Sequence, residues 1–128
     1  MTAAAAAKNS ATPRSMVEVR HISKTYAGGV EALNDLSIDF AEGQLTSLLG
    51  PSGCGKTTLL KIIAGLIPAS GGEVMVDGRV VTGPGPERAF VFQDFALMPW
   101  ASVMRNVAFG LELKGMARSE REAVAEKY

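Results

Sequence analysis

Eight consecutive residues near the middle of the chain match the phosphate-binding P-loop pattern G-x-x-x-x-G-K-[ST] without a mismatch. They are Gly50, Pro51, Ser52, Gly53, Cys54, Gly55, Lys56 and Thr57. Glycines allow backbone N–H groups to curl around phosphates, Lys56 can reach the outer phosphates, and the Thr57 hydroxyl can bind Mg²⁺. Such a loop connects a strand to a helix, so the motif constrains the fold as well as the type of ligand.

The residues on either side of the motif fit this requirement. The apolar run at residues 45–49 predicts a buried strand, and Thr58 to Ala64 predict a helix. Phosphates would then lie at a helix N-terminus. A chance match in a glycine-rich chain is the alternative, which the average glycine usage of about 7% and the flanking pattern disfavour. We therefore expect an α/β fold that binds a nucleotide.

Composition limits the chain to one globular domain. It has 128 residues, of which 47% are hydrophobic and 20% charged. Thirteen basic and thirteen acidic residues cancel, which argues against a nucleic-acid partner. No run approaches the 18 or so apolar residues of a membrane span, so the cytoplasm is the expected location. The single cysteine, Cys54, excludes an internal disulfide and fits a small filler of the loop better than a reactive thiol.

The first half of the chain predicts a tail followed by an antiparallel sheet. Residues 1–15 are rich in Ala, Ser and Thr and are expected to be disordered. Two alternating strands follow, one from Val17 through Ile22 and one over residues 33–40, joined by a turn at residues 27–29. A hairpin is predicted across Asp77-Gly78, the strongest short hairpin signal in the sequence. Gly65 and Pro68 should end the helix that follows the P-loop.

The second half predicts one more strand and two helices. Residues 89–92 indicate a buried strand that ends at Gln93. Ser102 is placed to cap a helix with apolar residues at every fourth position. Ser119 and Glu122 form a capping box for a last helix, which is expected to run on to Tyr128.

The order of these segments resembles the ATPase of ATP-binding cassette (ABC) transporters, from about Val17 to Tyr128. The resemblance rests on Lys24-Thr25-Tyr26, Gly50 to Thr58, Val91-Phe92-Gln93, Pro99-Trp100 and Asn106-Val107-Ala108-Phe109-Gly110. The amino-acid sequence at residues 83–88 and 97–100 is similar to that of the nitrate, sulfonate and taurine importer subgroup. The resemblance implies a P-loop NTPase nucleotide-binding domain of ABC type, with an N-terminal antiparallel β subdomain.

The resemblance also implies roles for individual residues. Tyr26 would stack on adenine, the P-loop through Thr58 would bind the phosphates of ATP, and Thr57 and Gln93 would bind Mg²⁺. From the residues alone, Tyr26 fits a side chain packed beside a turn, and Gln93 a solvated residue. The family's switch histidine lies far beyond Gln93, so His21 is expected to be a strand residue without catalytic use. Four carboxylates also receive no catalytic role: Asp35, Asp39, Asp77 and Asp94.

Partners follow from the same resemblance. The segment from Asp94 to Asn106 resembles the surface that receives a short cytoplasmic helix of the membrane permease. Its apolar side chains fit a docking patch or a folded-over loop core, and they are Phe95, Leu97, Met98 and Trp100. The resemblance further implies a second ATPase subunit in a homodimer, a solute-binding protein reached indirectly, and a place at the cytoplasmic face of the cell membrane.

The family's hydrolytic groups do not occur before Tyr128. They are an acidic strand with an aspartate and a glutamate, the signature Leu-Ser-Gly-Gly-Gln, and the switch histidine. We expect the chain to be truncated before the signature, to have negligible ATPase activity alone, and to be marginally stable. A non-hydrolysing nucleotide-binding or permease-docking remnant is one alternative. A GTPase would need Asn-Lys-x-Asp and a small-molecule kinase an arginine-rich lid, and neither occurs.

Overall fold

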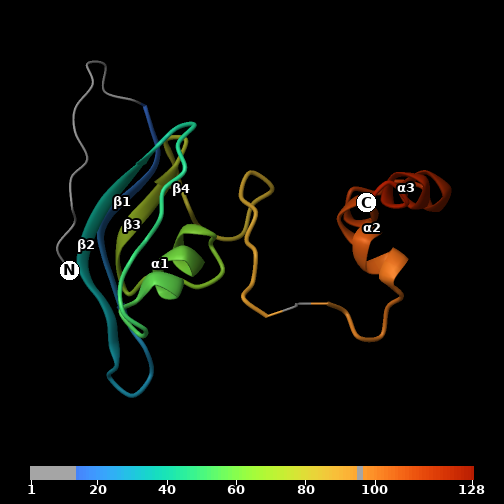
Figure 1. Cartoon of the computed structure of the whole chain (residues 1–128). Coiled ribbons are helices and arrows are strands. Elements are labelled where there is room, and N and C mark those ends of the chain that lie inside the picture. Colours follow the sequence, from blue (N-terminus) through green and yellow to red (C-terminus); the bar gives the residue numbers. More distant parts are fainter. Residues whose placement is uncertain (1–13, 95–96) are drawn as a thin grey trace. The chain divides into compact units, whose positions relative to one another are not determined.

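The computed structural model describes residues 14–94 and 97–128, which form two compact units that divide between Phe90 and Val91 (Figure 1). The first unit holds strands β1 (Ser15–Thr25), β2 (Glu31–Ala41), β3 (Gly71–Val76) and β4 (Arg79–Val80) and helix α1 (Lys56–Ile63). The second unit holds helices α2 (Val103–Leu113) and α3 (Arg118–Ala125). No helix in the described ranges is long and apolar enough to cross a bilayer.

The strands of the first unit form one antiparallel sheet in the order β2-β1-β3-β4. Val17 of β1 pairs with Phe40 of β2 on one side and with Val76 of β3 on the other. The two predicted strands are therefore confirmed as β1 and β2. Because β1 begins at Ser15, the last residue of the predicted tail is part of the sheet, and residues 1–13 lie outside the described residues.

Two tight turns connect these strands where the sequence predicts them. Gly28 and Gly29 have φ values of 91° and 80°, and the Gly29 N–H donates to the Tyr26 carbonyl at 3.1 Å. Asp77 and Gly78, between β3 and β4, have φ values of 49° and 71°. Two successive left-handed residues give a turn whose twist matches that of the strands, which confirms the predicted hairpin.

Helix α1 packs on one face of this sheet (Figure 1). Its buried residues Leu59 and Ile62 join a core cluster from three strands, namely Val19, Ile22, Leu33, Val74 and Val76. Full burial of an aliphatic side chain stabilises a fold by about 1.5–3 kcal/mol relative to exposure. The helix ends as predicted, because Gly65 turns left-handed with φ 75° directly after the cap residue Ala64.

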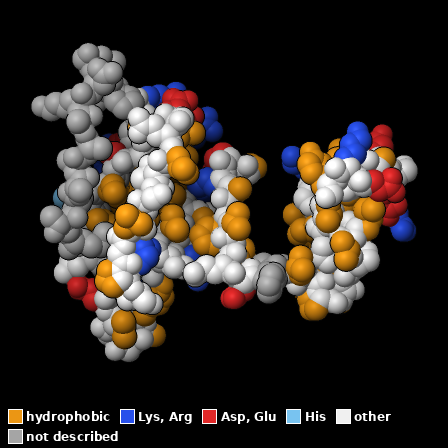
Figure 2. All heavy atoms as spheres, in the orientation of Figure 1, with side chains coloured by type: hydrophobic (Ala, Val, Ile, Leu, Met, Phe, Trp, Pro, Cys, Tyr) orange, Lys and Arg blue, Asp and Glu red, His pale blue; other side chains and the backbone are white. Residues whose placement is uncertain are grey.

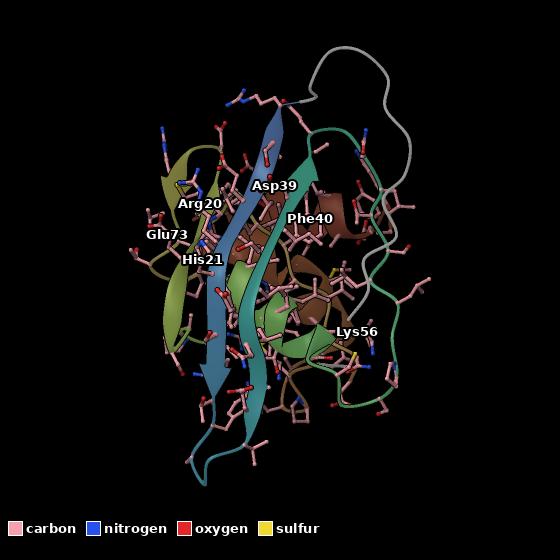
Figure 3. All side chains as sticks on the ribbon, turned by 90° about the vertical axis from the view of Figure 1, so that its left-hand side faces the viewer. Arg20, His21, Asp39, Phe40, Lys56 and Glu73 are labelled. Atoms are coloured by element: carbon pink, nitrogen blue, oxygen red, sulfur yellow. The ribbon has the colours of Figure 1, made fainter. Side chains whose placement is uncertain are left out.

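The ladder between β1 and β2 is interrupted at His21 and Asp35. Both residues have a positive φ, 51° and 46°, and the pairing shifts between Val19 and Ile22. Their exposed side chains meet, with His21 Nδ1 2.7 Å from Asp35 Oδ1. A Cβ on Gly72 would lie 2.3 Å from the His21 carbonyl oxygen. These contacts explain the position of His21 by the local geometry of the sheet (Figure 3).

Two predicted strands are absent from the described residues. Residues 45–49 and 89–92 have no strand geometry, and Leu45, Leu49 and Val91 are 98%, 86% and 92% exposed. Both segments have the composition of strands buried on two faces, and such strands persist only when neighbours satisfy their backbone groups. Both predictions were wrong, since neither segment has strand geometry within the described residues.

Helix α2 begins as the sequence predicts. The Ser102 hydroxyl accepts a hydrogen bond from the Arg105 N–H at 3.2 Å, which caps the first turn. Helices α2 and α3 pack against each other and bury Ala108 and Ala125. Glu112 of α2 links the two helices, since its carboxylate lies 3.3 Å from Arg121 of α3. The same carboxylate lies 3.3 Å from Arg105, which is also on α2.

The start and end of α3 differ from the prediction. The helix begins at Arg118 after the N-cap residue Ala117, so Ser119 lies inside it and does not cap it. The capping box fails because the Glu122 carboxylate accepts from Arg118 Nε at 2.8 Å, one turn earlier. This contact raises the pKa of the Arg118 guanidinium above its ordinary value. The helix ends at Ala125, before Tyr128.

Candidate nucleotide-binding site

The P-loop motif forms a compact turn that leads directly into α1. Gly53 and Gly55 adopt the left-handed region with φ 79° and 93°, and the helix begins at the next residue, Lys56. Gly55 is the N-cap and, within the described part of the chain, no side chain caps this helix by a hydrogen bond. The first N–H groups of α1 therefore point out of the helix without a side-chain acceptor. Such an end attracts a phosphate through its N–H groups and the helix dipole.

Close approach favours glycine at two of these positions and requires it at Gly55, where the neighbouring atom belongs to the backbone. A Cβ on Gly55 would lie 2.5 Å from the Ala32 carbonyl oxygen and 2.7 Å from Leu33 Cδ2, both on β2. A Cβ on Gly50 would lie 2.8 Å from the Cys54 sulfur. The first contact seats the loop directly against the sheet, and the second closes the loop on itself. The sheet thus fixes where the N-terminus of α1 lies.

Lys56 is folded into the loop that it would serve. Its Nζ donates to the carbonyl oxygens of Gly50 at 2.8 Å and Pro51 at 2.7 Å, and it lies 3.3 Å from Cys54 Sγ. Figure 3 shows Lys56 at the start of α1. The ammonium group is held by neutral acceptors only, so an anion entering the loop would gain the stronger, charge-assisted interaction.

Tyr26 reaches the same helix end from the turn after β1. Its hydroxyl lies 3.2 Å from Thr58 Oγ1, and Lys24 Nζ lies 5.4 Å from the centre of its ring. The ring remains 41% exposed. The structure therefore brings the Tyr26 hydroxyl to the first turn of α1 and leaves the residue partly exposed there, and its stacking on adenine stays a prediction. No local pattern indicates the contact with Thr58, which depends on the packing of α1 on the sheet.

The other residues that are predicted to bind nucleotide differ in their exposure and in the unit to which they belong. Pro51, Ser52 and Thr57 are exposed, and Cys54 is a partly buried free thiol inside the loop. Gln93 is also exposed but belongs to the second unit. The assignments of Thr57 and Gln93 to Mg²⁺ stay predictions.

The predicted docking segment lies in the second unit. Leu97 and Trp100 are 65% and 79% exposed, Met98 is partly buried, and Phe95 lies outside the described residues. Figure 2 shows several groups of hydrophobic side chains on the visible surface of this unit, among other side chains and backbone. Val103, which also lies within the predicted segment, is 81% exposed at the start of α2.

Comparison with known proteins gives one consistent family. The sequence profile described as ABC transporter matches residues 33–128. A taurine import ATP-binding protein of Pseudomonas putida is 50% identical over 113 residues, which are 88% of this chain and 43% of that protein. An uncharacterized ABC transporter ATP-binding protein of Methanocaldococcus jannaschii is 45% identical over 115 residues, 88% of this chain and 43% of that protein.

A solved structure shows the same fold. It is the dimeric structure of a post-hydrolysis state of an ATP-binding cassette bound to ADP and Pi. It aligns with a TM-score of 0.77 at 32% sequence identity, over 88% of this chain and 55% of the other. The chain spans less than half the length of the curated relatives that it matches.

Proposed function

The chain belongs to the ABC transporter family of ATP-binding proteins, and we propose that it binds ATP at the P-loop as part of the ATPase subunit of an importer. The observation that carries this proposal is the position of Lys56. Its ammonium group lies inside a loop of glycines at the uncapped start of α1, against backbone carbonyls that a phosphate can replace as partners. No other cation is needed to make this helix end attractive to a polyphosphate.

Each residue near the loop has a distinct part in this binding. The N–H groups of the loop and of the first turn of α1 would hold the phosphates, and Lys56 would follow them from its carbonyl partners. Tyr26 presents the exposed part of its ring for stacking on adenine, with its hydroxyl on Thr58. Thr57 and Gln93 supply oxygen atoms of the kind that Mg²⁺ prefers. Mg²⁺, when bound, neutralises charge on the phosphates.

The chain corresponds to the N-terminal portion of the family domain, which runs to residue 128 and begins at Ser15 of β1, one residue before the boundary at residue 16 that the sequence predicts. Hydrolysis in the complete protein would require an acidic strand, a signature and a switch histidine, which these 128 residues do not contain. We assign no catalytic residue here and expect negligible ATPase activity from these residues alone, because the groups that position water and stabilise charge are missing.

The transport role rests on the relatives. A taurine import ATP-binding protein at 50% identity supports an importer of the nitrate, sulfonate and taurine type. The partners would be a second ATPase subunit, a membrane permease that contacts the segment from Asp94 to Asn106, and, indirectly, a solute-binding protein. The location that we propose is the cytoplasmic face of the membrane.

The proposal is tested by ATP affinity. Lys56→Ala should weaken ATP binding to the chain by about tenfold to a hundredfold, the worth of one hydrogen bond to a charged group. Isothermal titration measures the change, and Lys61→Ala, in the last turn of the same helix, is the matched control. Tyr26→Ala should lose the stacking contribution that Tyr26→Phe keeps. Equal affinities of wild type and Lys56→Ala would disprove the assignment of the P-loop.

A second function is compatible with the same site. The chain can bind ATP without turnover, as a nucleotide-binding or permease-docking remnant. Phosphate release measured beside ATP affinity separates the two, since ATP binding without phosphate release by the longest protein expressed from the gene would favour the remnant. Binding of GTP in preference to ATP would instead indicate another class of P-loop enzyme.

A further inference from the structure

The side chain of Tyr26 is held at two places by its neighbours in the first unit. Its hydroxyl lies 3.2 Å from Thr58 Oγ1, in the first turn of α1. The Lys24 ammonium lies over its ring, with Nζ 5.4 Å from the ring centre. A cation at that distance over an aromatic face is attracted by the electrons of the ring. The first contact fixes the tip of the tyrosine, and the second fixes the orientation of its ring.

Lys24 is itself held in place by the backbone. Its Nζ donates to the Pro68 carbonyl at 2.7 Å, in the segment that follows α1. That segment is joined to the end of β1, since the Ser70 N–H donates to the Ser23 carbonyl at 2.8 Å and Ser70 Oγ accepts from the Thr25 N–H at 3.1 Å. A lysine that is ordered in this way has lost rotamer freedom before any ligand binds, so its ammonium group stays at one point beside the ring.

The backbone of Tyr26 is fixed as well. Its N–H donates to the Val30 carbonyl at 2.9 Å, and its carbonyl accepts from the Gly29 N–H at 3.1 Å. Lys24 lies two positions earlier, near the end of β1, and residues two apart in an extended chain have side chains on the same side. Tyr26 is 41% exposed. Because Lys24 covers one face of the ring, a base can stack only on the other face.

The positive charge of Lys24 is not neutralised by a carboxylate. Within residues 14–94 and 97–128, none of the ion pairs includes Lys24, and its two partners are a carbonyl and an aromatic ring. A charge on one face of a ring reduces the negative potential of the opposite face. Since the negative faces of two stacked rings repel each other, this change favours stacking on the side away from Lys24.

We propose that Lys24 is a positioning residue for the nucleobase, which orders the Tyr26 ring and directs the base to the face away from its ammonium group. This inference rests on the proposed function and deepens it, since it takes ATP to bind at the P-loop with its base on Tyr26. The two lysines near the site then have separate parts. Lys56 lies in the P-loop and serves the phosphates, whereas Lys24 acts on the base through the ring.

The proposal is tested by comparing ATP with inorganic tripolyphosphate, which has the phosphates but no base. Lys24→Met should lower the ratio of ATP affinity to tripolyphosphate affinity by about two- to fivefold, the effect of one exposed cation–π contact. A general loss of positive charge weakens both ligands and cancels in this ratio. Isothermal titration of the full chain measures both affinities. If Lys24→Met leaves the ratio unchanged, Lys24 does not position the base.

Two further lysine variants show whether the cation over the ring is the cause. Lys61→Met removes the same charge from the last turn of α1, away from the ring contact, and should leave the ratio unchanged. Lys24→Arg should restore the ratio that Lys24→Met loses, because a guanidinium also lies over aromatic faces. Equal losses in Lys24→Arg and Lys24→Met would overturn the role of the cation, as any change at this corner of the sheet would then disturb the ring.

Nuclear magnetic resonance of the tyrosine rings gives a readout that does not depend on affinity. The chain has two tyrosines, and Tyr128, at 98% exposure, serves as the internal reference. A base stacked on Tyr26 should shift the ring protons of Tyr26 to lower frequency and leave those of Tyr128 in place. At saturating ATP the shift should be smaller in Lys24→Met, because a less ordered ring is stacked for a smaller part of the time. Equal shifts in the two proteins would contradict the proposal.

Tyr26→Ala distinguishes a failure of this inference from a failure of the proposed function. If the base stacks on Tyr26, this variant should lower the same affinity ratio by about 5- to 150-fold. An unchanged ratio in Tyr26→Ala would mean that the base lies elsewhere, which overturns both the stacking and the role of Lys24. A lowered ratio in Tyr26→Ala beside an unchanged one in Lys24→Met would overturn the role of Lys24 alone.

Discussion

The two units of the chain differ in how many apolar side chains they bury. The first unit encloses a core cluster of seven residues between α1 and three strands, and it seats the P-loop against β2 through Gly55. The second unit buries only Ala108 and Ala125 among its described residues, and several of its large apolar side chains are exposed. Because hydrophobic stabilisation follows the apolar area removed from water, the first unit has its own source of stability and the second has little.

This difference separates two kinds of functional surface. The P-loop is seated by contacts that the first unit supplies itself, which give the loop a rigid support. The apolar surface of α2 is exposed in this chain and gains stability only when something covers it. The proposed nucleotide site thus lies on the unit with a core, and the proposed docking surface lies on the unit without one.

The largest effect is expected from Ile22→Ala, which tests whether the first unit has an independent core. Ile22 is fully buried, and its truncation should lower the free energy of unfolding by about 2–5 kcal/mol. Urea unfolding combined with hydrogen exchange measures the loss unit by unit. Leu113→Ala, at a position 72% exposed on α2, is the control and should change little. Equal loss of protection in α2 and α3 would show that the two units unfold together.

A smaller and more local effect is expected from Gly55→Ala, which tests how the sheet supports the P-loop. Gly55 has φ 93°, and its new Cβ would lie 2.5 Å from the Ala32 carbonyl oxygen. Left-handed strain alone costs about 1–2 kcal/mol, and the clash adds to it. Gly78→Ala is the matched control, since Gly78 has φ 71° but nothing within 4 Å of the added Cβ.

We expect Gly55→Ala to destabilise the fold more than Gly78→Ala and, unlike it, to weaken ATP binding. Thermal unfolding and calorimetric titration provide the two measurements. If both variants lose the same stability and keep the same ATP affinity, the contact with β2 does not position the loop. The difference between the two units would then not explain the position of the P-loop, because the loop would not depend on the sheet.

Sequence reasoning succeeded where the signal is local. The alternation in β1 and β2, the Asp77-Gly78 turn and the Ser102 cap each depend on neighbouring residues, and all were found. The strand predictions for residues 45–49 and 89–92 were wrong, because apolar composition alone does not determine whether a segment forms a strand. Ser119 failed as a cap because Glu122 has a competing partner in Arg118.

The candidate site shows the same division. The motif located the loop and the start of α1, since glycine spacing is a local property of the chain. The contacts of Gly55 with Ala32 and of Tyr26 with Thr58 join residues more than 20 positions apart and require the folded sheet. The hydrogen bond from the Met98 N–H to Asn106 Oδ1 spans only eight residues, but nothing in the residue type indicates that this side chain turns back onto Met98.

The smallest effect is expected from Glu122→Gln, which removes the negative charge beside Arg118 on the surface of α3 and leaves an oxygen that can still accept from Arg118 Nε. Because this carboxylate raises the pKa of Arg118, the pair contributes while the guanidinium is charged, and that contribution is lost only as pH rises through the raised value, far above neutrality. At neutral pH an exposed pair one helical turn apart contributes little. Amide exchange in α3 should therefore speed up by about twofold or less, and the difference from wild type should vanish in 1 M salt. Glu120→Gln is the control, since Glu120 has no ion-pair partner among the described residues. A large loss of protection in both helices would mean that charges hold the second unit together, in which case its exposed apolar surface would not need a partner to explain it.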